Sequence, residues 1–212
     1  MSKPPVLDML HEAISFKQTV QSVNLSRLDL RQVDLTGLVA QRLMAEGTKL
    51  DNALLTRTKL IEADFTEASL DGSNLENANL GLATFNRASM RETCLQYALF
   101  INGYCKNANL EYADLTAAEL TGSLFFGSHM YRAVLQMVKA DNTGFNRVNM
   151  KKADLRDGSF VRATFNHADL TEANLSGSNF SQADFRNAKL DNANWDGVQL
   201  AGALFSPGAT PK

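Results

Sequence analysis

The chain has few of the residues on which common site chemistries depend. Its 212 residues include two cysteines, three histidines, one tryptophan and four prolines. A disulfide framework needs more cysteines than this, and no cysteines are paired at zinc-binding spacing. The sequence motifs of nucleotide-binding loops, dinucleotide-binding turns, zinc proteases and serine hydrolases are also missing. We therefore expect a protein that is not an enzyme and holds no metal or organic cofactor.

Charge and hydropathy exclude further classes. The formal net charge of −2 argues against a basic nucleic-acid binder and against a strongly acidic mimic of nucleic acid. No run of apolar residues approaches the length of a membrane-spanning helix. The first residues, MSKPPVLDMLHE, lack the uninterrupted apolar stretch of a secretory signal. We expect a cytoplasmic protein that binds neither a membrane nor nucleic acid directly.

What the sequence does contain is a repeat of five residues. Every fifth residue from Leu25 to Phe205 is apolar, mostly Leu, Phe or Met, and we call this residue the centre of its unit. The residue two positions before each centre is usually Ala, and the residue just before it is often Asp or Asn. A helix repeats every 3.6 residues and a strand every two, so neither element explains a period of five.

Glycine marks a corner in each unit. Eight of the 13 glycines lie two residues after a centre. Gly and Asn tolerate a positive φ, so this position is predicted to be the turn residue of a tight β-turn. Each unit is then one short extended step followed by one corner.

The number of units in a full coil follows from columns of identical residues. Every twentieth residue from Phe65 to Phe205 is Phe, except Cys105, and a column of Leu runs from Leu35 to Leu175 and ends at Trp195. Stacking of like side chains inside a solenoid produces such columns. The sequence predicts an all-β solenoid, a quadrilateral β-helix of about nine 20-residue coils and roughly 44 Å in length.

Units such as ADFTE, ANLGL, ANLEY, ADLTA, ADLRD, ADLTE, ANLSG and ADFRN resemble the A(D/N)LXX motif of the pentapeptide repeat family. The resemblance covers residues 23–207 and implies a right-handed quadrilateral β-helix. Proteins with a similar repeat include bacterial quinolone-resistance proteins, which resemble duplex DNA and bind type II topoisomerases. That resemblance implies a DNA-mimicking, topoisomerase-binding function as one hypothesis.

The two ends of the chain differ. Residues 1–22 form a predicted capping segment, because Leu7, Leu10 and Ile14 have helical spacing and an open sheet edge needs protection. Residues 208–212 form a predicted mobile tail with no comparable cap. An uncovered last coil favours a homodimer, which we expect to be joined through Trp195, Leu200, Leu204 and Phe205.

Few residues remain as candidates for other chemistry. His129 and His167 lie on different faces, roughly two coils apart, and are expected to be ordinary surface residues. Cys105 belongs to the interior and Cys94 to the opposite side, so a disulfide between them is not expected. The Asp and Asn residues before the centres could suggest a ladder of metal sites, but short polar side chains beside a corner more often bond to local backbone.

Apolar residues at outward positions are the best candidates for a functional surface. They fall on two adjoining faces near the middle of the rod, where a contiguous group often marks an interface. The alternative is that some of them tuck against neighbouring coils. We call this group the mid-rod apolar edge: Leu82, Leu99, Ile101, Tyr104, Leu124 and Phe126.

These observations favour a non-catalytic protein-protein interaction module, a rigid rod that presents the mid-rod apolar edge to a protein partner. The topoisomerase hypothesis is weakened because the outward column that begins with Asp51 and Asp71 is broken by Arg91 and later by Lys151. A bacterial effector or secretion accessory is a third hypothesis. The sequence does not distinguish it from the first.

Overall fold

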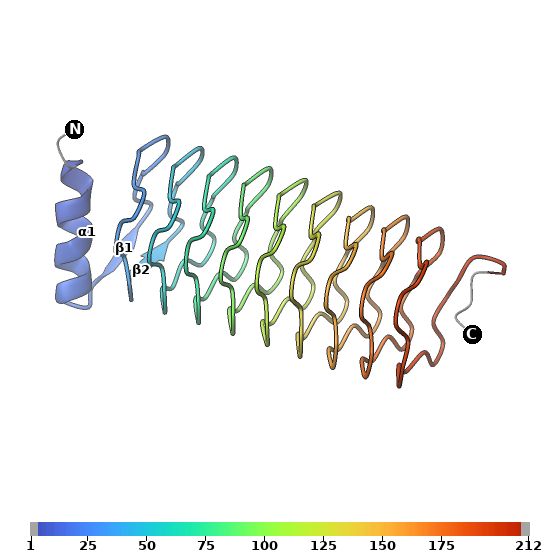
Figure 1. The fold of residues 1–212 in the computed structure, drawn as a ribbon. Helices are drawn as coiled ribbons and strands as arrows, with labels where there is room; N and C mark the ends of the chain where they lie inside the picture. Colours follow the sequence, from blue (N-terminus) through green and yellow to red (C-terminus); the bar gives the residue numbers. More distant parts are fainter. Residues whose placement is uncertain (1–3, 209–212) are drawn as a thin grey trace.

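A backbone pairing that repeats every 20 residues builds the rod (Figure 1). The computed structural model describes residues 4–208. Strand β1, Thr19–Gln21, pairs in parallel with strand β2, Val39–Gln41, and single parallel bridges continue the pairing up to Asp184 with Leu204. Helix α1, Pro5–Ser15, precedes the rod. The predicted 20-residue coil is confirmed, and the architecture is a right-handed quadrilateral β-helix with a short N-terminal helix.

Each five-residue unit turns one corner, as the glycine positions indicated. The residue two positions after each centre from Leu25 to Leu200 has a positive φ, for example 59° at Leu82 and 73° at Gly122. The turn is closed by a hydrogen bond such as that from the Ala53 N–H to the Leu50 carbonyl, at 3.0 Å. Most corner residues are not glycine, yet no Val, Ile or Thr has a positive φ among the described residues. A β-branched side chain clashes with the backbone in this conformation.

Two buried columns form the core. The centre and the residue two positions before it point inward and are buried from Leu38 to Phe185, whereas Val23, Leu28 and Val33 in the first coil are half-buried. Phe rings of successive coils stack nearly parallel, with centroids 4.8 Å apart for Phe65 and Phe85 and 5.1 Å apart for Phe145 and Phe165. Because every coil contributes the same layer, each coil buries apolar area only against its neighbours.

The Phe column is interrupted once, at Cys105, and a Phe ring from a neighbouring face fills part of the space. Cys105 is buried where a ring is expected, and Phe100 contacts the rings of Phe85 and Phe125 edge-on at 5.6 and 5.7 Å. Gly103 makes room for this, since a Cβ on it would lie only 2.2 Å from the Phe100 Cε2. A cavity of about 10 Å³ lined by apolar side chains and Cys105 remains. It lacks the polar partners that a buried water needs.

The N-terminal end of the rod is covered by α1. Leu7, Leu10 and Ala13 are buried, and His11 Nε2 lies 3.0 Å from the Asp34 carbonyl of the first coil. The helix is shorter than the capping segment predicted for residues 1–22, because β1 is already paired in the rod. Val20, one unit before Leu25, continues the five-residue register. The predicted mobile tail, residues 208–212, lies outside the described residues from 209 onward.

Candidate functional site

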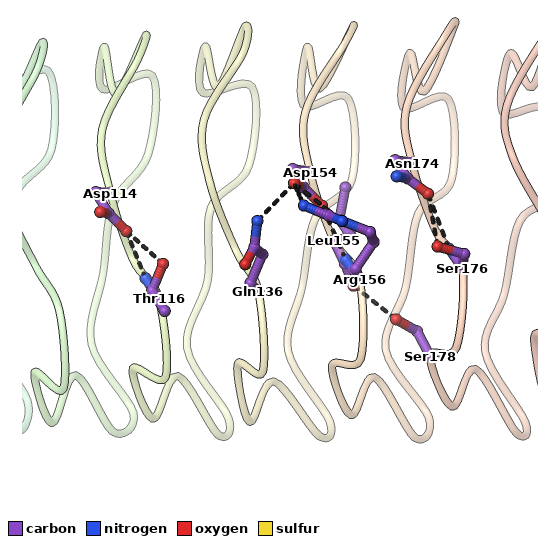
Figure 2. A network of polar contacts seen from close by, with 9 residues as sticks. All are labelled: Asp114, Thr116, Gln136, Asp154, Leu155, Arg156, Asn174, Ser176 and Ser178. Carbon is purple, nitrogen blue, oxygen red and sulfur yellow. Dashed lines mark hydrogen bonds and ion pairs between the residues drawn. The ribbon is translucent and has the colours of Figure 1, made fainter.

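Most of the surface uses its polar side chains to satisfy the backbone. On the face shown in Figure 2, Asp114 Oδ1 accepts the Thr116 N–H at 2.9 Å, and Asp154 accepts Gln136 Nε2 at 2.7 Å from one coil earlier. Elsewhere the acceptor lies a full coil away, as when Asn86 Oδ1 accepts the Lys106 N–H at 2.9 Å. Asp and Asn residues beside the centres thus accept hydrogen bonds from local backbone groups, as at Asp114, and also from side chains, as at Asp154.

Ion pairs reinforce the same polar surface. Arg186 forms a two-pronged contact with Asp184, with Nη2 and Oδ2 2.6 Å apart. The hydrogen bonds from the Arg186 side chain are the main reason that the pKa of the Asp184 carboxyl is lowered to about 2. Arg31 with Asp29 and Arg156 with Asp154 form the same kind of pair, between the residues on either side of one centre.

The mid-rod apolar edge departs from this pattern. Leu82, Leu99, Tyr104, Leu124 and Phe126 have 39–48% of their surface exposed, and Ile101 is half-buried. The structure brings these positions together. The Leu82 N–H donates to the Ile101 carbonyl at 2.9 Å, and Tyr104 and Leu124 pair in neighbouring coils.

Leu124 partly follows the alternative of tucking against the next coil. A Cβ built on Gly144 would lie 2.9 Å from the Leu124 Cδ2, so this side chain leans over a glycine. Nearly half of its surface is nevertheless exposed. The Leu124 side chain therefore packs against the Gly144 backbone on one side and is open to solvent on the other.

Two further exposed apolar residues adjoin this surface and were missed from the sequence. Tyr97 and Met137, 52% and 54% exposed, occupy one line of corners at the far side of the face that carries Leu99. Their corner position in the repeat could have identified them from the sequence. A bulky apolar residue at a corner has a positive φ and no core to pack against. They extend the apolar surface around that face.

Among the described residues, no segment covers the C-terminal coil. Trp195, Leu200 and Phe205 are only partly buried, and Leu204 is 49% exposed. Within residues 4–208, the N–H groups of Leu190, Trp195 and Leu200 have no hydrogen-bond acceptor, whereas the Leu170 N–H one coil earlier donates to the Lys189 carbonyl at 2.8 Å. The last coil thus presents an unpaired sheet edge, with Trp195 packed edge-on against Phe185 at 5.5 Å.

A family model described as "Pentapeptide repeats" matches this chain in eight copies, over residues 45–77, 68–103, 104–136, 145–182 and 178–206. The chain belongs to the pentapeptide repeat family. This confirms the resemblance seen in the sequence. A comparison with curated protein sequences finds no significant match.

Solved structures of other pentapeptide repeat proteins are similar over most of this chain. HetL from the cyanobacterium Nostoc sp. strain PCC 7120, a protein involved in regulating heterocyst differentiation, shares 24% identity over 100% of both chains, with a TM-score of 0.46. QnrB1, a plasmid-mediated fluoroquinolone resistance protein, shares 18% identity over 89% of this chain and 92% of its own, with a TM-score of 0.47. Family membership rests on the matched repeats and not on these two similarities.

The histidines and cysteines of this pentapeptide repeat protein lie apart from one another in the described structure. His129 and His167 are exposed, and no three His, Cys, Asp or Glu side chains among residues 4–208 could hold a metal ion together. Cys94 and Cys105 are free thiols, and burial raises the pKa of Cys105. Within the same residues, no helix is long and apolar enough to cross a membrane.

Several glutamates of this pentapeptide repeat protein form ion pairs with arginines of a neighbouring coil. Glu62 pairs with Arg42 at 2.9 Å, and Glu67 pairs with Arg87 at 2.6 Å. Further along the rod, Arg91 and Glu111 pair at 2.7 Å. These ion pairs run from coil to coil, so they reduce the continuous negative surface that a mimic of duplex DNA needs.

Proposed function

We propose that the protein is a non-catalytic interaction module that holds a protein partner on the mid-rod apolar edge. The observation that carries the proposal is the group of exposed aliphatic and aromatic side chains at neighbouring positions of successive coils. Their burial by a partner removes apolar surface from water, and contiguous groups of this kind are typical of interfaces. The rod beneath them keeps the positions of these side chains constant.

A capture experiment from the native host tests the proposal. The baits are the wild type, the edge variant Leu99→Asp/Leu124→Asp, and the control Leu54→Asp. Leu54 is 44% exposed and stands just before a centre, as Leu99 does, but lies outside the edge. We expect a partner that is retained by the wild type and the control and is lost from the edge variant. Equal capture by all three correctly folded baits contradicts the proposal.

The topoisomerase hypothesis can be tested directly, and we expect a negative result. The coil-to-coil ion pairs and the Arg91 interruption leave too little continuous negative charge for mimicry of DNA. Purified protein should therefore neither inhibit gyrase supercoiling nor relieve quinolone-induced cleavage at micromolar concentration. Clear protection in either assay would replace the proposed function with this one.

We further propose that the protein acts in the cytoplasm. Two free thiols fit the reducing cytoplasm. An effector or secretion accessory would use the same surface on a host protein, and the genomic neighbours of the coding sequence distinguish it from a cytoplasmic adaptor.

We also propose a homodimer through the open last coil, with Trp195, Leu200, Leu204 and Phe205 at the contact. Unpaired N–H groups and partly exposed apolar side chains support it, and an isologous contact closes without forming fibres. The end of one coil is a small contact, so dissociation on dilution is expected. Light scattering should show a rising mass with concentration for the wild type and a constant monomer mass of 23.2 kDa for Leu204→Asp. A wild type that stays monomeric at high micromolar concentration refutes the dimer.

A further inference from the structure

One aromatic residue of the mid-rod apolar edge lies between two positive charges. The Lys106 Nζ is 5.8 Å from the centroid of the Phe126 ring, and the Arg147 guanidinium carbon is 5.6 Å from it. The face of an aromatic ring attracts cations, and the attraction holds both side chains beside the exposed ring. The apolar edge therefore has a positive border on this side.

The positive border continues around the rod. The Arg132 guanidinium lies 5.6 Å from the Tyr131 ring, one face further around the coil, and Tyr131 contacts the Tyr112 ring edge-on at 5.7 Å. We call Lys106, Arg132 and Arg147 the cationic flank. All three are exposed.

The charge of the cationic flank is uncompensated. Between Pro4 and Gly208, none of its three residues forms an ion pair, whereas Arg42, Arg87 and Arg91 each contact a glutamate. Two of the seven described corner arginines, Arg42 and Arg87, contact a glutamate one coil away. The absence of such a carboxylate here leaves three cations beside exposed apolar residues.

The opposite side of the edge carries two carboxylates and a lysine. Glu119 pairs with Leu99 across neighbouring coils, and Asp141 lies one coil beyond, at the other side of the centre. Asp141 Oδ1 is already occupied by the Ser159 hydroxyl at 2.6 Å and the Val161 N–H at 3.0 Å. Lys139 pairs with Glu119 across neighbouring coils and is exposed, so this side carries both signs of charge. The cationic flank lies on the other side of the apolar residues.

From this arrangement we infer that the partner presents an acidic segment with apolar anchors. Its apolar side chains lie on the mid-rod apolar edge, and its carboxylates face the cationic flank. Complementary charges of this kind orient a partner and accelerate its association. The inference rests on the proposed function and adds the chemistry of the partner. A nucleic acid fits less well, because the aliphatic half of the surface offers nothing to phosphates and the protein has a net charge of −2.

A random dodecapeptide display library, selected on the full-length wild type, tests the inference. Selected peptides are synthesised and titrated by fluorescence anisotropy against four variants. The edge variant is Leu99→Asp/Leu124→Asp, and the flank variant is Lys106→Glu/Arg147→Glu. The controls are Leu54→Asp and Arg57→Glu/Lys59→Glu, the latter two cations also being exposed and without an ion pair in the described residues.

We expect the selected peptides to carry a net negative charge and at least two large apolar side chains. The edge and flank variants should each weaken binding by about tenfold or more, and raising the salt concentration should weaken it in the wild type. Both controls should bind within about twofold of the wild type.

The other outcomes separate the inference from the proposed function. One outcome is a set of neutral or basic peptides that lose affinity for the edge variant and bind the flank variant as tightly as the wild type. That result overturns the acidic partner but supports the mid-rod apolar edge as a docking surface. If the selected peptides bind the edge variant as tightly as the wild type, or if the selection yields no peptide, both the acidic partner and the proposed docking surface are overturned. A labelled 20-nucleotide oligothymidine that binds the wild type and is lost from the flank variant assigns the cationic flank to nucleic acid instead.

Discussion

Substitution of Gly103 by alanine distinguishes the structure from the repeat pattern. Gly103 stands two residues before a centre, where alanine is usual, and its φ lies outside the positive range. The pattern alone therefore predicts that Gly103→Ala stabilises the protein by about 0.4–1 kcal/mol, because alanine restricts the unfolded chain. In the structure, however, the added Cβ would lie 2.2, 2.4 and 2.7 Å from three atoms of the Phe100 ring.

The clash reverses the expected sign. Phe100 cannot move away freely, because its ring contacts Phe85 and Phe125 and is 5% exposed. Overpacking of this kind costs about 1–3 kcal/mol, so we expect the free energy of unfolding to fall by that amount. Urea denaturation followed by circular dichroism measures it.

Two further variants make the test specific. Gly81→Ala is the control, since its nearest neighbour is the Asn79 side-chain oxygen at 3.4 Å and its φ is not positive, so stability should be unchanged or slightly higher. Phe100→Leu should relieve the clash, because leucine is the centre one coil before and one coil after. Gly103→Ala should then cost at least about 1 kcal/mol less in the Phe100→Leu background than in the wild type. If Gly103→Ala is as stable as the wild type or more stable, the assigned position of the Phe100 ring is wrong.

Three other predictions follow from the same geometry. Phe145→Ala, which removes a fully buried ring stacked on Phe125 and Phe165, should cost about 3–5 kcal/mol in urea unfolding; a loss below about 1 kcal/mol means that the inward register is wrong. Asn142→Val places a β-branched residue at a φ of 56° and should cost about 1–2 kcal/mol, whereas Asn142→Gly should be tolerated; equal stability of the two variants contradicts the corner argument. The pKa of Asp184 is lowered from 3.8 to about 2 in the folded protein, so its stabilising contribution is complete above the ordinary value and is lost as the pH falls from about 4 toward 2. Asp184→Asn should flatten the stability curve in that range, and an unchanged slope counts against the Arg186 contact as its cause.

The sequence by itself determined the coil. A period of five with like residues every 20 positions has few physical solutions, because the inward columns must stack and each unit needs a residue that tolerates a positive φ. In the early coils Leu38 stands where alanine is usual and the next centre, Ala40, is small. Both side chains are buried, so volume is exchanged between the two inward columns. The outward position of the six residues of the mid-rod apolar edge also followed from the register, because the register states which positions point outward.

Only the tertiary structure decided what happens where the register is broken or where side chains reach beyond their own unit. A column of residues does not show that the Phe100 ring moves over Gly103 to fill part of the space at Cys105. Nor does it show that Lys106 and Arg147 meet at Phe126, because they lie on different coils and their long side chains have several possible partners. The early start of the rod at β1 is a third case, since a short segment pairs only when the next coil is present to receive it. These features depend on distances between side chains in neighbouring coils, which a periodic sequence leaves open.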